Sequence, residues 1–245
     1  MEKQTSQYER VGDKELFSRN LRQKVEGRNL EYMPLISILT PTIRPKGLEI
    51  VQKCLAEQTY QGFEWLVEVG IPEKGNDLCK AINRMLKRAK GKWIVMLQDY
   101  IKILPDGLER FLKVADEKKF ITGSMGITED WKDIKWDWRA FRKFEPIQYH
   151  ECEADWMIAP KKAFFELGGY DEEYDNYWGM ENVNIAFRAE KLGYTFWVLS
   201  DNKAIQWAHD KFIKHPFRAR WNPLFHQDKI RQIDMGESPI KLNYL

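Results

Sequence analysis

The chain has 245 residues, of which 43% are hydrophobic and 31% are charged, and its formal net charge is +2. This balance is typical of a folded globular protein and excludes an intrinsically disordered chain. The small net charge gives no support for nucleic-acid binding. No apolar run reaches the about 20 residues that a membrane-spanning helix needs, and the charged start MEKQTSQYER differs from a signal peptide.

The number and spacing of the cysteines indicate the redox environment of the protein. Cys54, Cys79 and Cys152 are scattered, odd in number and without a C-x-x-C pair. This usage argues against a disulfide framework and against a structural zinc site. It predicts a reducing, cytoplasmic environment. The basic, aromatic run at residues 216–225 would also suit peripheral contact with a membrane surface.

The first part of the chain alternates between strand-like and helix-like patterns. Residues 1–33 are polar and carry both charge signs, which predicts an N-terminal arm or helix. Apolar, β-branched runs then predict three strands, over residues 35–42, 63–70 and 93–99. Amphipathic periodicity predicts the intervening helices, over residues 48–58 and 78–89 and from Pro105 onward. Asp77 is the expected N-cap of the second helix.

This alternation predicts the α/β class, with a mostly parallel sheet flanked by helices. Ligands of such sheets bind beyond the carboxyl ends of the strands. The loops that follow the three strands should therefore converge on one crevice. They are Thr40–Arg44, Glu68–Asp77 and Gln98–Lys102.

The second part of the chain has a different character, because eight of the ten tryptophans lie after residue 130. Residues 129–144 have no clean period and predict a loop or short strands. The other expected elements are strands over 120–127, 156–160, 196–200 and 204–210, a short helix after Pro160, and a helix over 181–192 ended by Gly193. No linker separates the halves. We expect one domain over residues 34–210 with two lobes, 34–120 and 121–210, and a basic extension over 211–245.

Three residues stand out for chemistry, each with a structural alternative. Asp99 ends an apolar strand, where a carboxylate can hold a divalent cation or simply support a turn. His209 follows another apolar run and could complete a mixed oxygen and nitrogen site for Mn²⁺ or Mg²⁺, or be a structural histidine. Glu181 lies where a loop meets a helix, so it could act as a general base or stabilise the helix N-terminus.

The basic tail has two interpretations as well. Its cations could hold a diphosphate, or they could form an ordinary solvated face. The cations concerned are Lys211, Lys214, Arg218 and Arg220. The chain contains no Walker loop, G-x-G-x-x-G, H-E-x-x-H or G-x-S-x-G motif, which removes the common NTPase, dinucleotide, zinc-protease and hydrolase interpretations.

Three blocks in this order resemble the family 2 glycosyltransferases, which have the GT-A fold. Residues 36–70 are similar to the opening of that family, and residues 76–108 to its next block, including the helical Asn83, the metal-binding strand tip and the P-D-G-L helix start. Residues 168–194 resemble a later block that is shared with galactosyltransferases and polypeptide N-acetylgalactosaminyltransferases. The resemblance covers about residues 35–210.

The resemblance implies roles for individual residues. Those implied for the nucleotide side are Thr40, Pro41, Thr42, Arg44, Glu68, Asn83 and Asp99. Those implied for the sugar and acceptor are Asp155, Trp156, Trp178 and Gly179, with the Trp131–Trp138 cluster as a further wall. Glu181 and Asn182 take the catalytic position, and Asp99 with His209 the position of a Mn²⁺ or Mg²⁺ ion. Lobe 34–120 would then hold the nucleotide, and lobe 121–210 the sugar and acceptor.

Three positions depart from the family pattern. Glu68-Val69-Gly70 replaces Asp-Asp-Gly, Gln98-Asp99-Tyr100 keeps only one carboxylate of the D-x-D motif, and Asn182 stands where many inverting members have an aspartate. The implied activity is metal-assisted transfer of a sugar from a nucleotide diphosphate sugar, with UDP favoured, to a hydroxyl of a glycan, lipid, protein or modified nucleic acid. The alternatives are a catalytically impaired nucleotide-sugar-binding protein and, ranked lower, a nucleotidyltransferase.

Overall fold

A computed structural model describes residues 35–70, 77–176, 180–208 and 223–245 of the chain. The chain divides into two compact units, Met1–Met33 and Pro34–Leu245. The predicted N-terminal arm lies outside the described residues, so the fold is that of the second unit. No helix in the described ranges is long and apolar enough to cross a bilayer.

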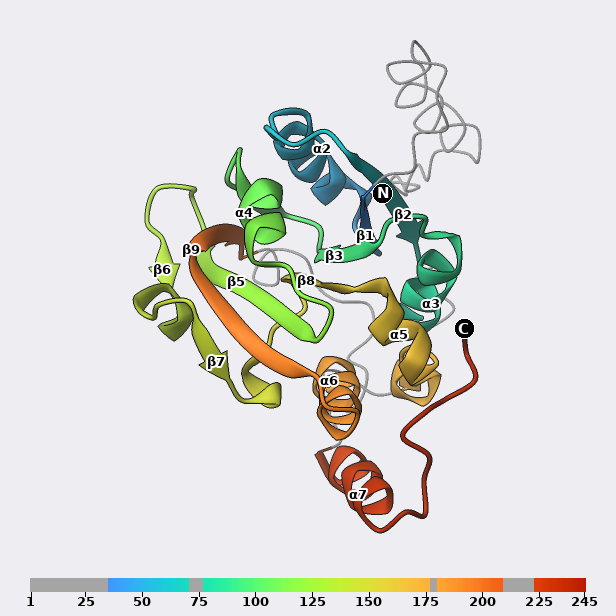
Figure 1. Ribbon diagram of the computed structural model, residues 1–245. Helices are drawn as coiled ribbons and strands as arrows, with labels where there is room; N and C mark the ends of the chain where they lie inside the picture. The colour runs from blue at the N-terminus through green and yellow to red at the C-terminus, as the bar shows by residue number, and fades with distance from the viewer. Residues whose placement is uncertain (1–34, 71–76, 177–179, 209–222) are drawn as a thin grey trace, which may run out of the picture. The chain divides into compact units, whose positions relative to one another are not determined.

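The second unit is built on one large sheet (Figure 1). Along its main path the strands are β2 (Phe63–Val69), β1 (Ile36–Thr42), β3 (Trp93–Leu97), β8 (Trp156–Pro160), β5 (Lys119–Thr128), β9 (Thr195–Trp207) and β4 (Ile101–Ile103). Strand β8 is antiparallel to both of its neighbours, and β4 is antiparallel to β9. The other strands of the path share one direction, so the predicted α/β class with a mostly parallel sheet is confirmed.

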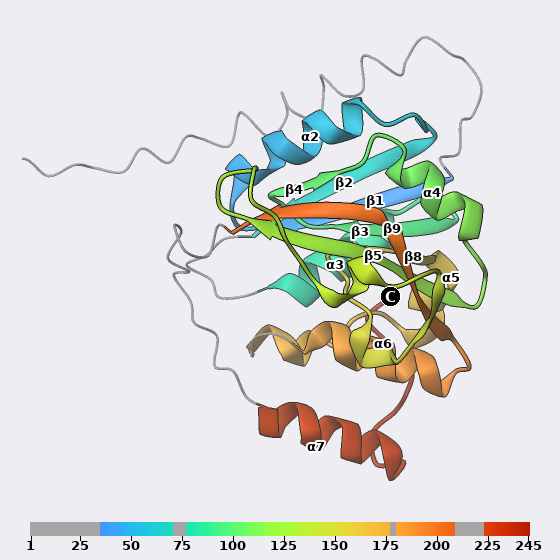
Figure 2. The ribbon, with the colours of Figure 1, turned by 90° about the vertical axis from the view of Figure 1, so that its left-hand side faces the viewer.

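Helices cover both faces of the sheet, as Figure 2 shows. One face packs against α2 (Leu48–Ala56) and α4 (Gly107–Val114). The other face packs against α3 (Leu78–Arg88), α5 (Lys161–Leu167) and α6 (Glu181–Lys191), and α7 (Pro223–Asp234) lies beyond α6. Two apolar clusters, one on each face, therefore form the core. This three-layer arrangement leaves the strand ends, rather than the sheet faces, available for ligands.

Most predicted elements are present, with differences that come from tertiary pairing. The two runs expected to be separate closing strands form one strand, β9, whose pairing register with β5 shifts at Gly123/Ser124. Within 129–144 lie the short strand β6 (Lys135–Trp136) and the 3-10 helix η3 (Trp138–Phe141). Strand β4, the short strand β7 (Glu145–Ile147) and helix α7 were not predicted from the sequence pattern. Their runs are too short or too weakly periodic for local patterns to find them.

The N-terminus of α3 differs in its cap. Asp77 occupies the N-cap position, but its side chain makes no capping hydrogen bond. Instead, Asp175, from the 3-10 helix η5 (Glu172–Asn176), accepts from the backbone N–H groups of Cys79 at 2.6 Å and Lys80 at 3.2 Å. The predicted N-cap position of Asp77 is therefore confirmed, but its side chain does not supply the capping hydrogen bond. The Asp175 carboxylate, almost a hundred residues away in the chain, thus accepts from N–H groups that have no partner within the helix. This contact joins η5 to α3.

The C-terminal segment packs onto the turn between α5 and η5. Leu242 N–H donates to the carbonyl of Leu167, and Tyr244 N–H donates to that of Gly168. Gly168 has a φ of +71°, and a Cβ there would collide with the Leu242 carbonyl. Only glycine suits both the left-handed backbone and this close approach. The basic extension thus belongs to the same folded unit as the sheet, and it supports the segment that leads to α6.

Candidate active site

The carboxyl ends of β1 and β3 meet at a buried carboxylate. Asp99 follows β3, is 1% exposed, and accepts from the hydroxyl of Thr42 at the end of β1. Arg44 approaches the same carboxylate with two nitrogens, its Nε at 3.2 Å from one oxygen and a terminal nitrogen at 2.7 Å from the other. Two of the three loops predicted to converge, Thr40–Arg44 and Gln98–Lys102, are thus confirmed as neighbours.

The end of β2 lies beside them, because Gly70 N–H donates to the Thr42 carbonyl at 2.8 Å. Glu68 points toward α3, where its carboxylate contacts Arg88 at 2.5 Å and Arg84 at 3.4 Å. Arg84 also pairs with Asp77 at 3.1 Å. Glu68 keeps partial exposure at the strand end, and its charge is paired with the two arginines of α3.

The antiparallel insertion of β8 adds a second carboxylate to this edge. Because β8 runs against β3, its first residue, Trp156, pairs with Leu97 at the carboxyl end of β3. The residue before it, Asp155, lies at the same end of β3. Its carbonyl accepts from the backbone N–H of Gln98 at 3.2 Å. Burial, together with the negative charges of Glu153, Glu181 and Asp99, raises the pKa of Asp155 to about 7.

Glu181 begins α6 and is partly buried. Its Oε2 accepts from the backbone N–H of Met180 at 3.0 Å, so part of its structural alternative, support of a helix N-terminus, is realised. Its charge also reaches Asp155, Cys79 and Tyr170, since it raises the pKa of each. Asn182 follows it and is partly buried as well. Asp99, Asp155 and Glu181 therefore form one group of carboxylates, which we call the acidic edge.

The pKa of Asp155 predicts a pH-dependent stability. A carboxyl whose pKa is raised above its ordinary 3.8 binds its proton more tightly in the folded state, so stability falls as the pH rises from about 4 to about 7. Asp155→Asn removes this cost. We expect the variant to raise the melting temperature by about 2–6 °C near pH 8, corresponding to about 1–2 kcal/mol after allowance for partial exposure.

At about pH 2.5 the same substitution should change the melting temperature little, because the carboxyl of Asp155 is then protonated in both the folded and the unfolded state. Asp133→Asn, at an exposed position, is the matched control and should have no effect at either pH. A gain of equal size at both pH values would assign the effect to packing and contradict the raised pKa.

Several residues predicted for the nucleotide are buried instead. Thr40 is fully buried. Its hydroxyl donates to the Leu97 carbonyl at 2.7 Å and accepts from the Trp65 Nε1–H at 2.9 Å. Pro41 is also buried. Asn83 is buried, and its amide bonds the backbone of Tyr170 from both its nitrogen and its oxygen. As placed, these side chains join core elements and do not face the crevice.

Trp156 likewise differs from its prediction as a wall for sugar. It is 1% exposed, packs on Phe111 with ring centroids 4.5 Å apart, and donates from its Nε1 to the Asn202 carbonyl. A Cβ on Gly123 would collide with its ring, so the strand closes directly over the indole. Trp156 is a core residue. Trp178, Gly179, His209 and the basic tail cations lie outside the described residues.

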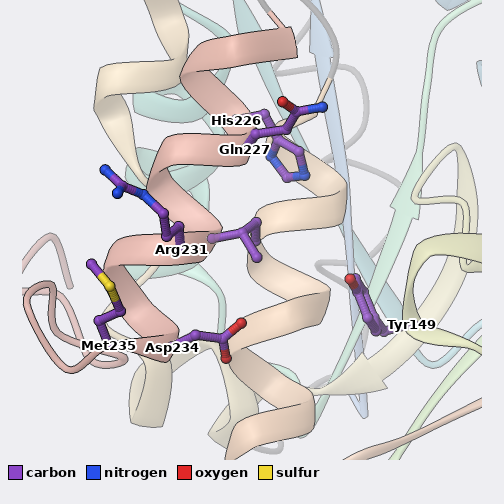
Figure 3. Close-up of a pocket in the computed structure, with 7 residues that line it drawn as sticks. Tyr149, His226, Gln227, Arg231, Asp234 and Met235 are labelled. Atoms are coloured by element: carbon purple, nitrogen blue, oxygen red, sulfur yellow. The ribbon is translucent and has the colours of Figure 1, made fainter.

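Two cavities lie away from the acidic edge. One, of about 460 Å³, lies between α2 and β4 and is lined by Trp131, whose ring carries the Lys102 ammonium at 4.2 Å. It contains one member of the predicted Trp131–Trp138 cluster. The other, of about 380 Å³, lies between α7 and Tyr149 (Figure 3) and contains no predicted site residue.

The predicted Mn²⁺ or Mg²⁺ site can be examined at Asp99. Both oxygens of this carboxylate already accept from Thr42 or Arg44. Within the described ranges, no group of three or more His, Cys, Asp or Glu side chains is placed to hold a metal ion. The described residues therefore do not fit a resident divalent cation, and no step of the chemistry below passes through one.

Sequence reasoning missed Tyr100. It has a φ of +59°, unusual for a residue other than glycine, and its ring lies 5.7 Å from the Arg44 guanidinium and 5.3 Å from the Trp207 ring. Such backbone conformations concentrate at functional sites. The available signal was the replacement of the second D-x-D carboxylate by an aromatic residue.

Comparison with solved structures identifies the fold. The chain is similar to S. aureus TarS in complex with UDP-GlcNAc, with a TM-score of 0.62 and 16% identity over 82% of this chain and 65% of that one. The chain has the GT-A fold. It is also similar to GalNAc-T7 with UDP, GalNAc and Mn²⁺, with a TM-score of 0.53 and 12% identity over 73% of this chain and 44% of that one.

One curated relative supports the same resemblance at the level of sequence. A probable N-acetylgalactosaminyltransferase 9 from Caenorhabditis elegans is 40% identical over 63 residues, which are 26% of this chain and 9% of that protein. No family model matches the chain. The chain spans less than two thirds of the length of each of these proteins. The predicted resemblance to GT-A glycosyltransferases is therefore confirmed.

Proposed function

We propose that this chain is a glycosyltransferase that moves a sugar from a UDP-sugar to an acceptor hydroxyl. The observation that carries the proposal is the acidic edge, where Asp99, Asp155 and Glu181 gather at the carboxyl ends of a GT-A sheet. Ligands of such sheets bind at this position. The similar TarS structure holds UDP-GlcNAc and the GalNAc-T7 structure holds UDP and GalNAc, which favours a UDP-linked donor.

On the donor side, Thr42 and Arg44 would face the nucleotide diphosphate, and Glu68 the base. The Arg44 guanidinium is 14% exposed and is planar, which suits paired hydrogen bonds to phosphate oxygens. Its orientation is fixed by Asp99, whose carboxylate lies beneath it. These residues would bind the donor and stabilise the charge that develops on the leaving diphosphate.

On the acceptor side, Glu181 would act on the hydroxyl. In an inverting reaction the acceptor oxygen forms a bond to the anomeric carbon, the bond to the diphosphate breaks, and the hydroxyl proton passes to Glu181. In a retaining reaction the same carboxylate orients the donor, and Asn182 adds an amide next to it. Asp155, whose pKa is raised to about 7, supplies a second carboxyl that can exchange a proton near neutrality.

The acceptor is proposed to reach Glu181 from the tryptophan-rich second half of the chain, to which Trp131, Trp136 and Trp138 belong. An indole offers a flat apolar face to the C–H groups of a sugar ring. Trp178 and Gly179 stay part of this proposal by their place in the sequence. The cytoplasmic location is also part of it, and the free, buried thiols of Cys54, Cys79 and Cys152 support it.

The proposal predicts a donor-specific thermal shift. A ligand present at about 100 times its dissociation constant stabilises the native state by about 2.7 kcal/mol, which corresponds to a rise in melting temperature of about 5–10 °C for a chain of this size. A panel of UDP-, GDP-, ADP- and TDP-sugars should give this shift with UDP-sugars and little with the others.

The same panel, extended with nucleoside triphosphates and followed by an assay of UDP release, separates the alternatives. A shift with UDP-sugars accompanied by slow release of UDP supports a transferase, whereas a shift without any UDP release supports the impaired binding protein. A shift with a nucleoside triphosphate alone would favour a nucleotidyltransferase. Absence of any shift across the panel would contradict the proposed function.

A further inference from the structure

We propose that Arg44 supplies the positive charge at the donor diphosphate, in the place that a divalent cation takes in metal-dependent relatives, so that the donor binds without metal. The proposal rests on the proposed function, because it concerns how the same site holds a UDP-sugar. The starting observation is that the residues around Asp99 differ from what the resemblance implies. The resemblance implies a cation at Asp99, and the described residues around Asp99 do not fit one.

The carboxylate of Asp99 is committed on both oxygens. One oxygen accepts from the Thr42 hydroxyl and from Arg44 Nε, and the other accepts from an Arg44 terminal nitrogen at 2.7 Å. The carboxylate is buried, and Thr42 in turn accepts from the Arg44 backbone N–H at 2.8 Å. A cation could reach Asp99 only by displacing the guanidinium from this closed set of hydrogen bonds.

The Arg44 guanidinium already offsets the charge of Asp99. Asp99 is the one carboxylate of the D-x-D motif that remains, and Gln98 and Tyr100 beside it are neutral. A divalent cation added beside Arg44 would face a like charge at close range in a buried place, which is unfavourable.

The position of the Arg44 side chain is set by its neighbours. It follows β1, and its guanidinium lies between Asp99 and the Tyr100 ring, whose centroid is 5.7 Å away. Tyr100 is held in the left-handed conformation, and its carbonyl accepts from Trp207 N–H in β9. Arginine stays protonated at all physiological pH values and presents a rigid fork of donors. The Arg44 guanidinium is therefore charged and held at the strand edge before a ligand binds.

The test compares binding of UDP with binding of uridine by titration calorimetry, in excess EDTA and in Mn²⁺. The gain in affinity of UDP over uridine isolates the contribution of the diphosphate. In the wild type this gain should stay within about twofold when EDTA replaces Mn²⁺. Arg44→Gln should reduce it by about 10- to 100-fold, and Arg44→Lys should reduce it less, because the charge remains while the fork is lost.

Two further variants control for folding. Arg44→Gln leaves a buried carboxylate unpaired, so the double variant Arg44→Gln/Asp99→Asn removes both charges and should fold while still lacking the diphosphate gain in EDTA. Lys46→Gln changes an exposed cation of the same loop and should bind like the wild type. A gain that appears only with Mn²⁺, or one that survives in the Arg44 variants, would overturn the proposal. If neither UDP nor uridine binds in any condition, the proposed function itself is overturned, and this inference with it.

Discussion

Glu181→Gln is expected to lower the rate of sugar transfer by about 10²- to 10⁴-fold, the range for loss of a general acid or base, while the affinity for UDP stays unchanged. The amide oxygen of glutamine can still accept from Met180 N–H, so the start of α6 should be preserved. What the substitution removes is the carboxylate that would take the acceptor proton. The measurement is the initial rate of UDP release with saturating UDP-sugar and acceptor, alongside calorimetric binding of UDP.

Glu190→Gln is the matched control, since it makes the same change on an exposed position of the same helix and should leave the rate unchanged. If Glu181→Gln keeps near wild-type turnover, the catalytic role passes to Asp155, the other partly buried carboxyl of the acidic edge. If the rate and the affinity for UDP fall together by the same factor, Glu181 serves donor binding instead.

Arg188→Met should destabilise the fold by about 3–5 kcal/mol, which lowers the melting temperature by about 10 °C or more. Arg188 is 1% exposed, and burial lowers its pKa to about 10. Its guanidinium donates to the carbonyls of Leu167 and Gly169 and to the side-chain oxygen of Asn184. Methionine fills much of the volume but leaves the Gly169 carbonyl and the Asn184 side-chain oxygen without this donor, and each one carries a desolvation cost. The Leu167 carbonyl still accepts from Leu242 N–H.

Chemical denaturation of the two proteins measures this effect directly. Arg231→Met, on the exposed surface of α7, is the control and should change the free energy of unfolding by less than about 0.5 kcal/mol. A loss below about 1 kcal/mol for Arg188→Met would show that water replaces the guanidinium and would contradict its structural role.

The parts of the fold that local patterns encode could be predicted. The strands β1, β2 and β3 and the helices between them follow from apolar runs and helical periodicity, and parallel strand order then brings Thr42 and Asp99 together. The antiparallel course of β8 has no such local signal. The antiparallel course depends on the pairing of Trp156 with Leu97. The same pairing sets the position of Asp155 at the site.

The roles of single polar residues were harder, because a sequence does not reveal which partner a side chain finds. Asn83 and Thr40 were predicted for the nucleotide from the resemblance, yet their polar atoms bond the backbone of Tyr170 and Leu97. Asp175 accepts from the backbone N–H groups at the start of α3. Its partner lies far away in the chain, and long-range pairs of this kind follow from the assembled fold.

The order of the strands has a consequence for how this protein folds. The first and second halves of the chain interleave in one ladder of hydrogen bonds, since β8 lies between β3 and β5, and β4 pairs with β9. Neither half can complete its sheet before the other is synthesised. Pairings of such long sequence separation make folding slow relative to helical proteins of similar size.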